Sequence, residues 1–235
     1  MASIVDSFRE VFSDNFSFFK LAIFTAPAYY NYILYTQAMK NNDFGGFNFM
    51  LWINIFLFLG FLVKITGNVI NERDRILPSL NPLSILLASL KGILAIGVYA
   101  WISIAIANYL CSLINIVQWV DIALQSIIWL VVASIILAAF LMFSRNERIL
   151  DAYNMKMLSD KVGDLIVVIL FFLLQLAVIN IPTIGFLGYT LLILFGFGPI
   201  FDVFVAYAIV FNIAVLGHYM GQVHYETFSY NQQQL

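Results

Sequence analysis

The sequence predicts an all-α, polytopic integral membrane protein with six transmembrane helices, interfacial amphipathic helices and one broken or re-entrant segment. Its 235 residues are 63% hydrophobic and only 10% charged, with a mean hydropathy of +0.94. A soluble domain carries about 25% charged residues. The apolar residues also gather in runs long enough to cross a hydrocarbon core of about 30 Å. Lipid is therefore the expected solvent for most of the chain.

Residues 1–16 are expected to form an amphipathic helix along the bilayer surface. Apolar side chains recur three or four positions apart, and the charged ones fall elsewhere. These apolar residues are Ile4, Val5, Phe8, Val11, Phe12 and Phe16. Ser3 and Asp6 have the spacing of an N-cap and its reciprocal partner. A cleavable signal peptide is the alternative, but the leader is mostly acidic and Pro27 interrupts the following apolar run.

Residues 17–220 form the predicted membrane domain, and residues 221–235 are a polar tail that is expected to fray. A span needs about 20 apolar residues. The predicted spans are residues 17–37, 47–70, 93–113, 121–143, 164–181 and 199–220. The third span carries small side chains at helical spacing, which favours close approach of another helix. These are Gly97, Ala100, Ser103, Ala107 and Cys111.

The stretch of residues 71–92 connects the second and third spans and organises the chain around it. Asn81 followed by Pro82 predicts a helix start, because Asn caps free backbone donors and Pro lacks the donor that would be wasted. Gly92 is a possible elbow before the third span. Residues 146–163 repeat part of this pattern, and Ser159 is expected to begin the cap of the fifth span.

The last apolar region is too long for one span and too short for two spans and a loop. Gly196, Gly198 and Pro199 interrupt it near the middle. Residues 185–197 are therefore predicted to form a half-helix or re-entrant piece. Non-helical backbone at that depth must be covered by protein.

The basic residues predict the orientation of the chain. With six spans and a cytoplasmic N-terminus, all but Lys40 fall on the cytoplasmic side, as the positive-inside rule requires. The cytoplasmic residues are Arg9, Lys20, Lys64, Arg73, Arg75, Lys91, Arg145, Arg148, Lys156 and Lys161. Lys64 can snorkel to the headgroups. Both termini are expected in the cytoplasm of a cell whose inner membrane holds the protein.

Asp202 is the sharpest candidate for chemistry, because an acid in apolar surroundings after a helix break can handle ions or protons. The alternative is that Asp202 lies in the first turn of a helix, where the helix dipole favours a negative charge. Amides within the spans form either a polar path or ordinary interhelical hydrogen bonds. These are Asn54, Asn108, Gln125, Gln175 and Asn212, of which Asn108, Gln175 and Asn212 join Asp202 in the candidate path.

Other site classes lack their signatures. His218 and His224 are six residues apart, which does not put two imidazoles on one helix face for a metal. A single cysteine, Cys111, offers neither a disulfide nor a thiol cluster. The sequence contains no Ser-His-Asp order, zinc signature or phosphate-binding glycine loop, and no dense basic cluster for nucleic acid. No cofactor is expected, and an enzyme ranks third among the functional classes.

Three short motifs carry a resemblance to a known family. They are Leu77-Pro78 after a charged helix end, Ala88-Ser89-Leu90-Lys91-Gly92, and Gly217-His218-Tyr219-Met220-Gly221-Gln222. Together they resemble a family of multi-pass bacterial and archaeal membrane proteins known as a domain of unknown function (number four thousand and thirteen). The sequence has Asn81-Pro82-Leu83 where that family is expected to have an acidic residue. The resemblance implies a compact helical membrane domain and supplies no activity.

Two functional hypotheses follow. The first is a non-catalytic membrane scaffold that binds the lipid bilayer, another copy of itself or a partner on the cytoplasmic side. Its cytoplasmic interface contains Arg73, Arg75, Lys91, Arg145 and Arg148. The alternative is a small-solute or ion transporter or channel that uses the broken region from Gly196 to Asp202, because transporter folds contain interrupted helices.

Overall fold

The computed structural model describes residues 3–14, 16–73, 75–79, 81–113, 118–180, 185–196 and 198–229, without the side chains of residues 118, 119, 155, 171–173, 175–180 and 229. The regular elements of this part are all helices. They are α1 (Ile4–Ser13), α2 (Ser17–Asn41), α3 (Gly45–Ile70), α4 (Pro82–Leu113), α5 (Gln118–Asn146), the 3₁₀ helix η1 (Ile149–Tyr153), α6 (Met155–Asn180), α7 (Phe186–Phe195), α8 (Pro199–His224) and the π-helical turn η3 (Tyr225–Ser229).

Four helices are long and apolar enough to cross a membrane, judged by length and composition. They cover Gly45–Ile70, Pro82–Leu113, Val120–Asn146 and Pro199–Phe228. An all-helical chain with several membrane-length apolar helices is thus confirmed. The helix α2 is not among the four, because Lys20, Asn31 and four tyrosines lower its hydropathy. Since part of α6 lacks described side chains, the count of six spans stays a prediction.

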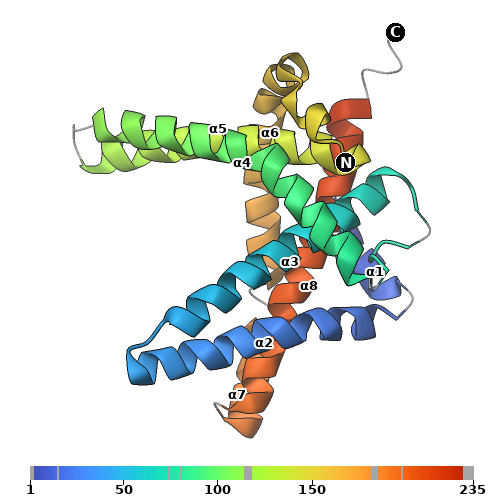
Figure 1. Cartoon of the computed structure of the whole chain (residues 1–235), viewed down its shortest axis with the longest axis vertical. Helices are drawn as coiled ribbons and strands as arrows, with labels where there is room; N and C mark the ends of the chain where they lie inside the picture. The colour runs from blue at the N-terminus through green and yellow to red at the C-terminus, as the bar shows by residue number, and fades with distance from the viewer. Residues whose placement is uncertain are drawn as a thin grey trace.

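The helices form divergent pairs that meet around α3. Figure 1 shows α2 beside α3, α4 beside α5 in a second pair, and α7 at the foot of α8. The central helix α3 packs against α2, α4, α5 and α8. Its side chains Phe61, Val63 and Ile65 are fully buried and belong to the main hydrophobic core.

Glycines bring the central helices into close contact. A Cβ atom added to Gly60 of α3 would lie 2.2 Å from the carbonyl oxygen of Ile85 in α4. Added to Gly221 of α8, it would lie 2.5 Å from the Cβ of Val69 in α3, and Gly217, one turn earlier, is similarly crowded. Gly217 and Gly221 thus form a small-xxx-small contact with α3. The sequence analysis used these glycines only for the family resemblance and missed their packing role.

Several local predictions can be compared with the structure. Asn81 caps α4, since its Oδ1 accepts a hydrogen bond from the Ser84 N–H at 3.3 Å, and Pro82 is the first helical residue. Helix α4 runs through Gly92 without ending there, and Phe143 packs against that position, so the elbow predicted at Gly92 is not a break between two helices. The cap predicted at Ser159 is wrong. Helix α6 begins at Met155, and Asn154 Oδ1 accepts from the Met157 N–H at 3.2 Å.

The break before α8 lies where it was predicted. Gly196 ends α7 with φ +69°, a left-handed conformation that glycine adopts without steric cost. Gly198 is extended and Pro199 is the first residue of α8. The 10 residues of α7 span about 15 Å, half a hydrocarbon core, and the half-helix or re-entrant piece over residues 185–197 stays a prediction. The phenyl rings of Phe201 and Phe204 in α8 pack on α7 at Gly188.

Candidate functional site

The ends of α3, α5 and α8 are joined at one end of the bundle, which we call the basic end. Lys64 Nζ lies 2.6 Å from Glu147 Oε1, just after α5. Asn71 Nδ2 donates to the carbonyl oxygen of Arg145 at 3.0 Å. The Tyr225 hydroxyl, just after α8, donates to Glu72 Oε1 at 2.6 Å. Segments that the sequence analysis assigned to one side of the membrane therefore lie together.

The N-terminal helix α1 docks on the end of α8. The Ser3 N–H donates to Gln222 Oε1 at 2.8 Å, and Ser7 Oγ lies 2.9 Å from His218 Nδ1. Ser3 also caps α1, as predicted, but Gln222 takes the place expected for Asp6 as the acceptor of its N–H. The apolar face predicted for lipid is shared with protein, because Ile4 and Val11 are buried while Val5, Phe12 and Phe16 stay exposed.

A buried carboxylate connects the start of the chain to residues 75–79. Asp14 Oδ1 accepts from Lys20 Nζ at 2.7 Å, and Asp14 Oδ2 accepts from the Leu77 N–H at 2.8 Å. The Asp14 side chain is 1% exposed and that of Lys20 is 10% exposed. Because both oxygens of the carboxylate are used, the loop after α3 is held against the junction of α1 and α2. We call this arrangement the Asp14 clamp.

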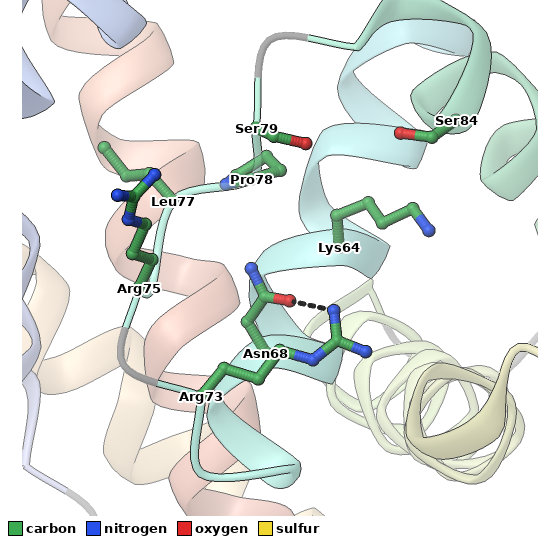
Figure 2. Close-up of a pocket in the computed structure, with 8 residues that line it drawn as sticks. All are labelled: Lys64, Asn68, Arg73, Arg75, Leu77, Pro78, Ser79 and Ser84. Atoms are coloured by element: carbon green, nitrogen blue, oxygen red, sulfur yellow. Dashed lines mark hydrogen bonds between the residues drawn. The ribbon is translucent and has the colours of Figure 1, made fainter.

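The loop held by the clamp forms one wall of a cavity of about 350 Å³. The lining residues come from α3, the loop and the first turn of α4. They are Lys64, Asn68, Arg73, Arg75, Leu77, Pro78, Ser79 and Ser84. Figure 2 shows the Ser79 and Ser84 hydroxyls facing each other, with Lys64 below them and Arg75 across the loop beside Leu77. We call this space the basic cavity.

Asn68 organises the floor of the basic cavity. Its Oδ1 accepts from Arg73 Nη1 at 3.0 Å, and its Nδ2 donates to the carbonyl oxygen of Ile76 at 3.0 Å (Figure 2 shows the Arg73 bond). Asn68 is 6% exposed, so its orientation is fixed by these two bonds. The lining carries three cations and no acid among the described residues. Such a set of Arg and Lys donors suits a phosphate or carboxylate group.

Two further cavities are lined mostly by apolar side chains. One of about 240 Å³ lies between α2, α3 and the start of α4, and we call it the apolar groove. Its lining residues are Ile23, Phe24, Pro27, Leu57, Pro82 and Ile85. The other, of about 310 Å³, lies between α4 and α5 and includes Ser103 and Ala107. The small-residue stripe predicted in the third span therefore faces α5.

Of the candidate polar path, the side chains of Asp202, Asn212 and Asn108 are described, and they do not share a cavity. Asp202 and Asn212 lie on α8 ten positions apart, about 15 Å along the helix. Asn108 is exposed on α4, and the side chain of Gln175 lies outside the described residues. Neither Asp202 nor Asn212 lines any of the three cavities introduced above.

Asp202 fits the helix-dipole interpretation and has a polar neighbour. It lies in the first turn of α8, half-buried, and interacts with the hydroxyl of Tyr32 in α2. Its backbone N–H donates to the Gly198 carbonyl at 3.1 Å. Asn212 donates to the Ala208 carbonyl of its own helix at 2.8 Å, and its Oδ1 is buried without a partner.

The predicted interface residues divide into two groups. Arg73 and Arg75 line the basic cavity, whereas Lys91, Arg145 and Arg148 are exposed elsewhere. The predicted interface did not include the other polar residues that line this cavity, which are Lys64, Asn68, Ser79 and Ser84. Lys64 and Asn68 are four positions apart and so share a face of α3 directly before the basic loop. That spacing is the signal that could have found them.

No group of three or more His, Cys, Asp or Glu residues within the described ranges could hold a metal ion. Comparisons with protein-family models, curated proteins and solved structures found no match. The function is therefore argued from the residues themselves.

Proposed function

We propose that this protein is a non-catalytic, six-span scaffold of the inner membrane whose basic end faces the cytoplasm and binds the lipid surface or a partner there. The observation that carries the proposal is the basic end itself. Helix α1, the loop after α3 and the ends of α5 and α8 are joined there by hydrogen bonds and ion pairs. Anionic lipids of the cytoplasmic leaflet attract basic segments at such a position.

The contact between the two ends of the chain supports an even number of spans. Ser3 and Gln222 are hydrogen bonded at 2.8 Å, so both lie on the same side of any bilayer that the helices cross. Four long apolar helices supply four crossings, and α2 and α6, at 25 and 26 residues, are long enough to supply two more. The resemblance to the multi-pass family of unknown function is part of this proposal.

Cysteine labelling tests the orientation. In a Cys111→Ser background, Leu235→Cys should react with a membrane-impermeant maleimide only after the cells are permeabilised. Lys40→Cys, in the last turn of α2, should react in intact cells. Labelling of Leu235→Cys from outside would contradict the proposal. For the scaffold role, crosslinking in membranes should capture an oligomer or a partner at the basic end, and recovery of a lone monomer would count against it.

Transport is a second candidate because of unpartnered amides inside the bundle. The side-chain oxygens of Asn31, Asn54 and Asn212 are buried without a hydrogen-bond partner among the described residues. They come from three helices that pack on one another, α2, α3 and α8, and buried polar atoms are normally paired. In proteoliposomes, transport predicts that Asp202→Asn abolishes ion-linked or proton-linked flux. A wild-type protein that carries no flux would end this hypothesis.

A further inference from the structure

We infer that the basic cavity and the apolar groove together form a binding site for one anionic phospholipid. The phosphate of the headgroup occupies the basic cavity, and the start of an acyl chain occupies the apolar groove. This inference rests on the proposed function, because it requires the basic end to lie at a membrane surface.

The two spaces adjoin on the first turns of α4. Ser84 lines the basic cavity. Pro82, two positions before it, and Ile85, directly after it, line the apolar groove. On α3 the groove residue Leu57 precedes the cavity residue Lys64 by seven positions, about 10 Å along the helix. The polar space is the nearer of the two to the end of α3, and the apolar space lies further into the bundle. A phospholipid has this same order of polar and apolar groups when its headgroup is at the interface.

The charges of the cavity favour an anion. The charge of Lys64 is matched by Glu147 at 2.6 Å, whereas the hydrogen bond of Arg73 goes to the neutral amide of Asn68. Arg75, which Figure 2 shows across the loop beside Leu77, adds a further cation to the lining. Asp74, between the two arginines in the sequence, lies outside the described residues. Guanidinium groups bind phosphate oxygens with paired hydrogen bonds, and the quaternary ammonium of a zwitterionic headgroup would be repelled here.

The walls of the site are already fixed without a ligand. The Asp14 clamp holds the backbone of Leu77, and Asn68 holds both the Arg73 guanidinium and the Ile76 carbonyl. A site whose donors are held in place loses less conformational entropy on binding. The cavity of about 350 Å³ is at the small end of the range for small-molecule sites, which suits a headgroup rather than a large cofactor.

Binding of a fluorescent short-chain phosphatidylglycerol to the full-length protein in neutral detergent tests the assignment. The wild-type protein should bind this lipid saturably and at least about tenfold more tightly than the matching phosphatidylcholine, since a charge-assisted hydrogen bond is worth roughly that factor. The double variant Arg73→Gln, Arg75→Gln should lose about tenfold or more in affinity. The matched control Lys40→Gln, Lys156→Gln removes the same charge from exposed positions outside both the cavity and the predicted interface, and it should bind as the wild type does.

A second pair of variants tests the acyl-chain half of the site. Leu57→Trp fills the apolar groove and should weaken binding of the lipid by about tenfold, because the displaced chain segment loses several buried methylene groups. Leu110→Trp adds the same side chain to the cavity between α4 and α5 and should leave the affinity unchanged. Gel filtration and thermal unfolding of each variant establish that it is folded.

The outcomes separate the possible ligands. Equal binding of phosphatidylcholine, or equal loss in the Lys40→Gln, Lys156→Gln control, would overturn the anionic site. If inorganic phosphate displaces the lipid at similar concentrations and Leu57→Trp binds normally, the site takes a free phosphate group and the lipid assignment is wrong. The labelling of Leu235→Cys decides the proposed function separately. A cytoplasmic tail with no saturable lipid binding would overturn this inference alone.

Discussion

Replacement of Gly60 by alanine tests the close packing of α3 against α4. The new Cβ would lie 2.2 Å from the Ile85 carbonyl oxygen and 2.3 Å from Ser89 Oγ. Carbon and oxygen atoms in such contacts normally lie about 3.3 Å apart, so the two helices would have to separate by about 1 Å. The separation also strains the bond from the buried Ser89 hydroxyl across to the Phe56 carbonyl in α3.

The size of the effect follows from these contacts. Overpacking costs about 1–3 kcal/mol, and a weakened buried hydrogen bond adds about 1 kcal/mol. Alanine regains about 1 kcal/mol of helix propensity over glycine. We therefore expect Gly60→Ala to lower the free energy of unfolding by about 1–3 kcal/mol.

Thermal unfolding in detergent, followed by loss of the monodisperse gel-filtration peak, measures this change. Gly163→Ala is the matched control, since a Cβ there meets nothing within 4 Å. It should be neutral or stabilising by up to about 1 kcal/mol. If Gly60→Ala proves as stable as Gly163→Ala, then α3 and α4 are not in the close contact described here.

Three further perturbations test other parts of the structure. Asp14→Asn leaves the buried ammonium of Lys20 without its carboxylate and should lower the free energy of unfolding by about 3 kcal/mol, with faster tryptic cleavage in the loop after α3. The control Asp160→Asn, at an exposed position, should change neither the stability nor the cleavage rate. A double-mutant cycle of Lys64→Met with Glu147→Gln should give a coupling free energy of about 1 kcal/mol. A cycle on Lys161 and Asp164 in α6, which lie 3.8 Å apart with the Asp164 side chain 66% exposed, should give almost none. Equal couplings would contradict the closer and less exposed geometry of the Lys64–Glu147 pair. Gly196→Ala should destabilise the protein by about 1 kcal/mol because of its φ of +69°. The control Gly185→Ala, just before α7 with φ −62°, should not destabilise it. Equal melting temperatures of the two variants would refute the strained turn.

Features with a local cause were predictable from the sequence. The break at Gly196 and Pro199 depends on the conformations of single residues, and the cap at Asn81 depends on a side chain next to its own helix. Gly92 shows the limit of that reasoning. Glycine permits both a bend and a close contact, and the contact at Gly92 is made with Phe143, which lies in a distant part of the chain.

The candidate site was predictable only in part, because some of its contacts join residues that are far apart in the chain. Arg73 and Arg75 follow an apolar run directly, so their charge pattern indicates an interface. The partners of Lys64 and Asp14 are 83 and 63 residues away, at Glu147 and Leu77, and no periodicity connects them. The sequence indicated a snorkelling lysine at 64, whereas the structure gives that lysine a carboxylate partner. The distance between Lys64 and Glu147 in the folded protein decides between these two interpretations, and the composition of the chain does not show that distance.

The docking of α1 on α8 has a consequence for the timing of assembly. Ser7 meets a histidine 211 residues later, and Ser3 meets a glutamine 219 residues later. At about 5–20 residues added per second, the ribosome needs on the order of 10–40 s to deliver those partners. During this interval the face of α1 that packs on α8 lacks that partner. Helix α1 can therefore reach its final position only after α8 has been made and inserted.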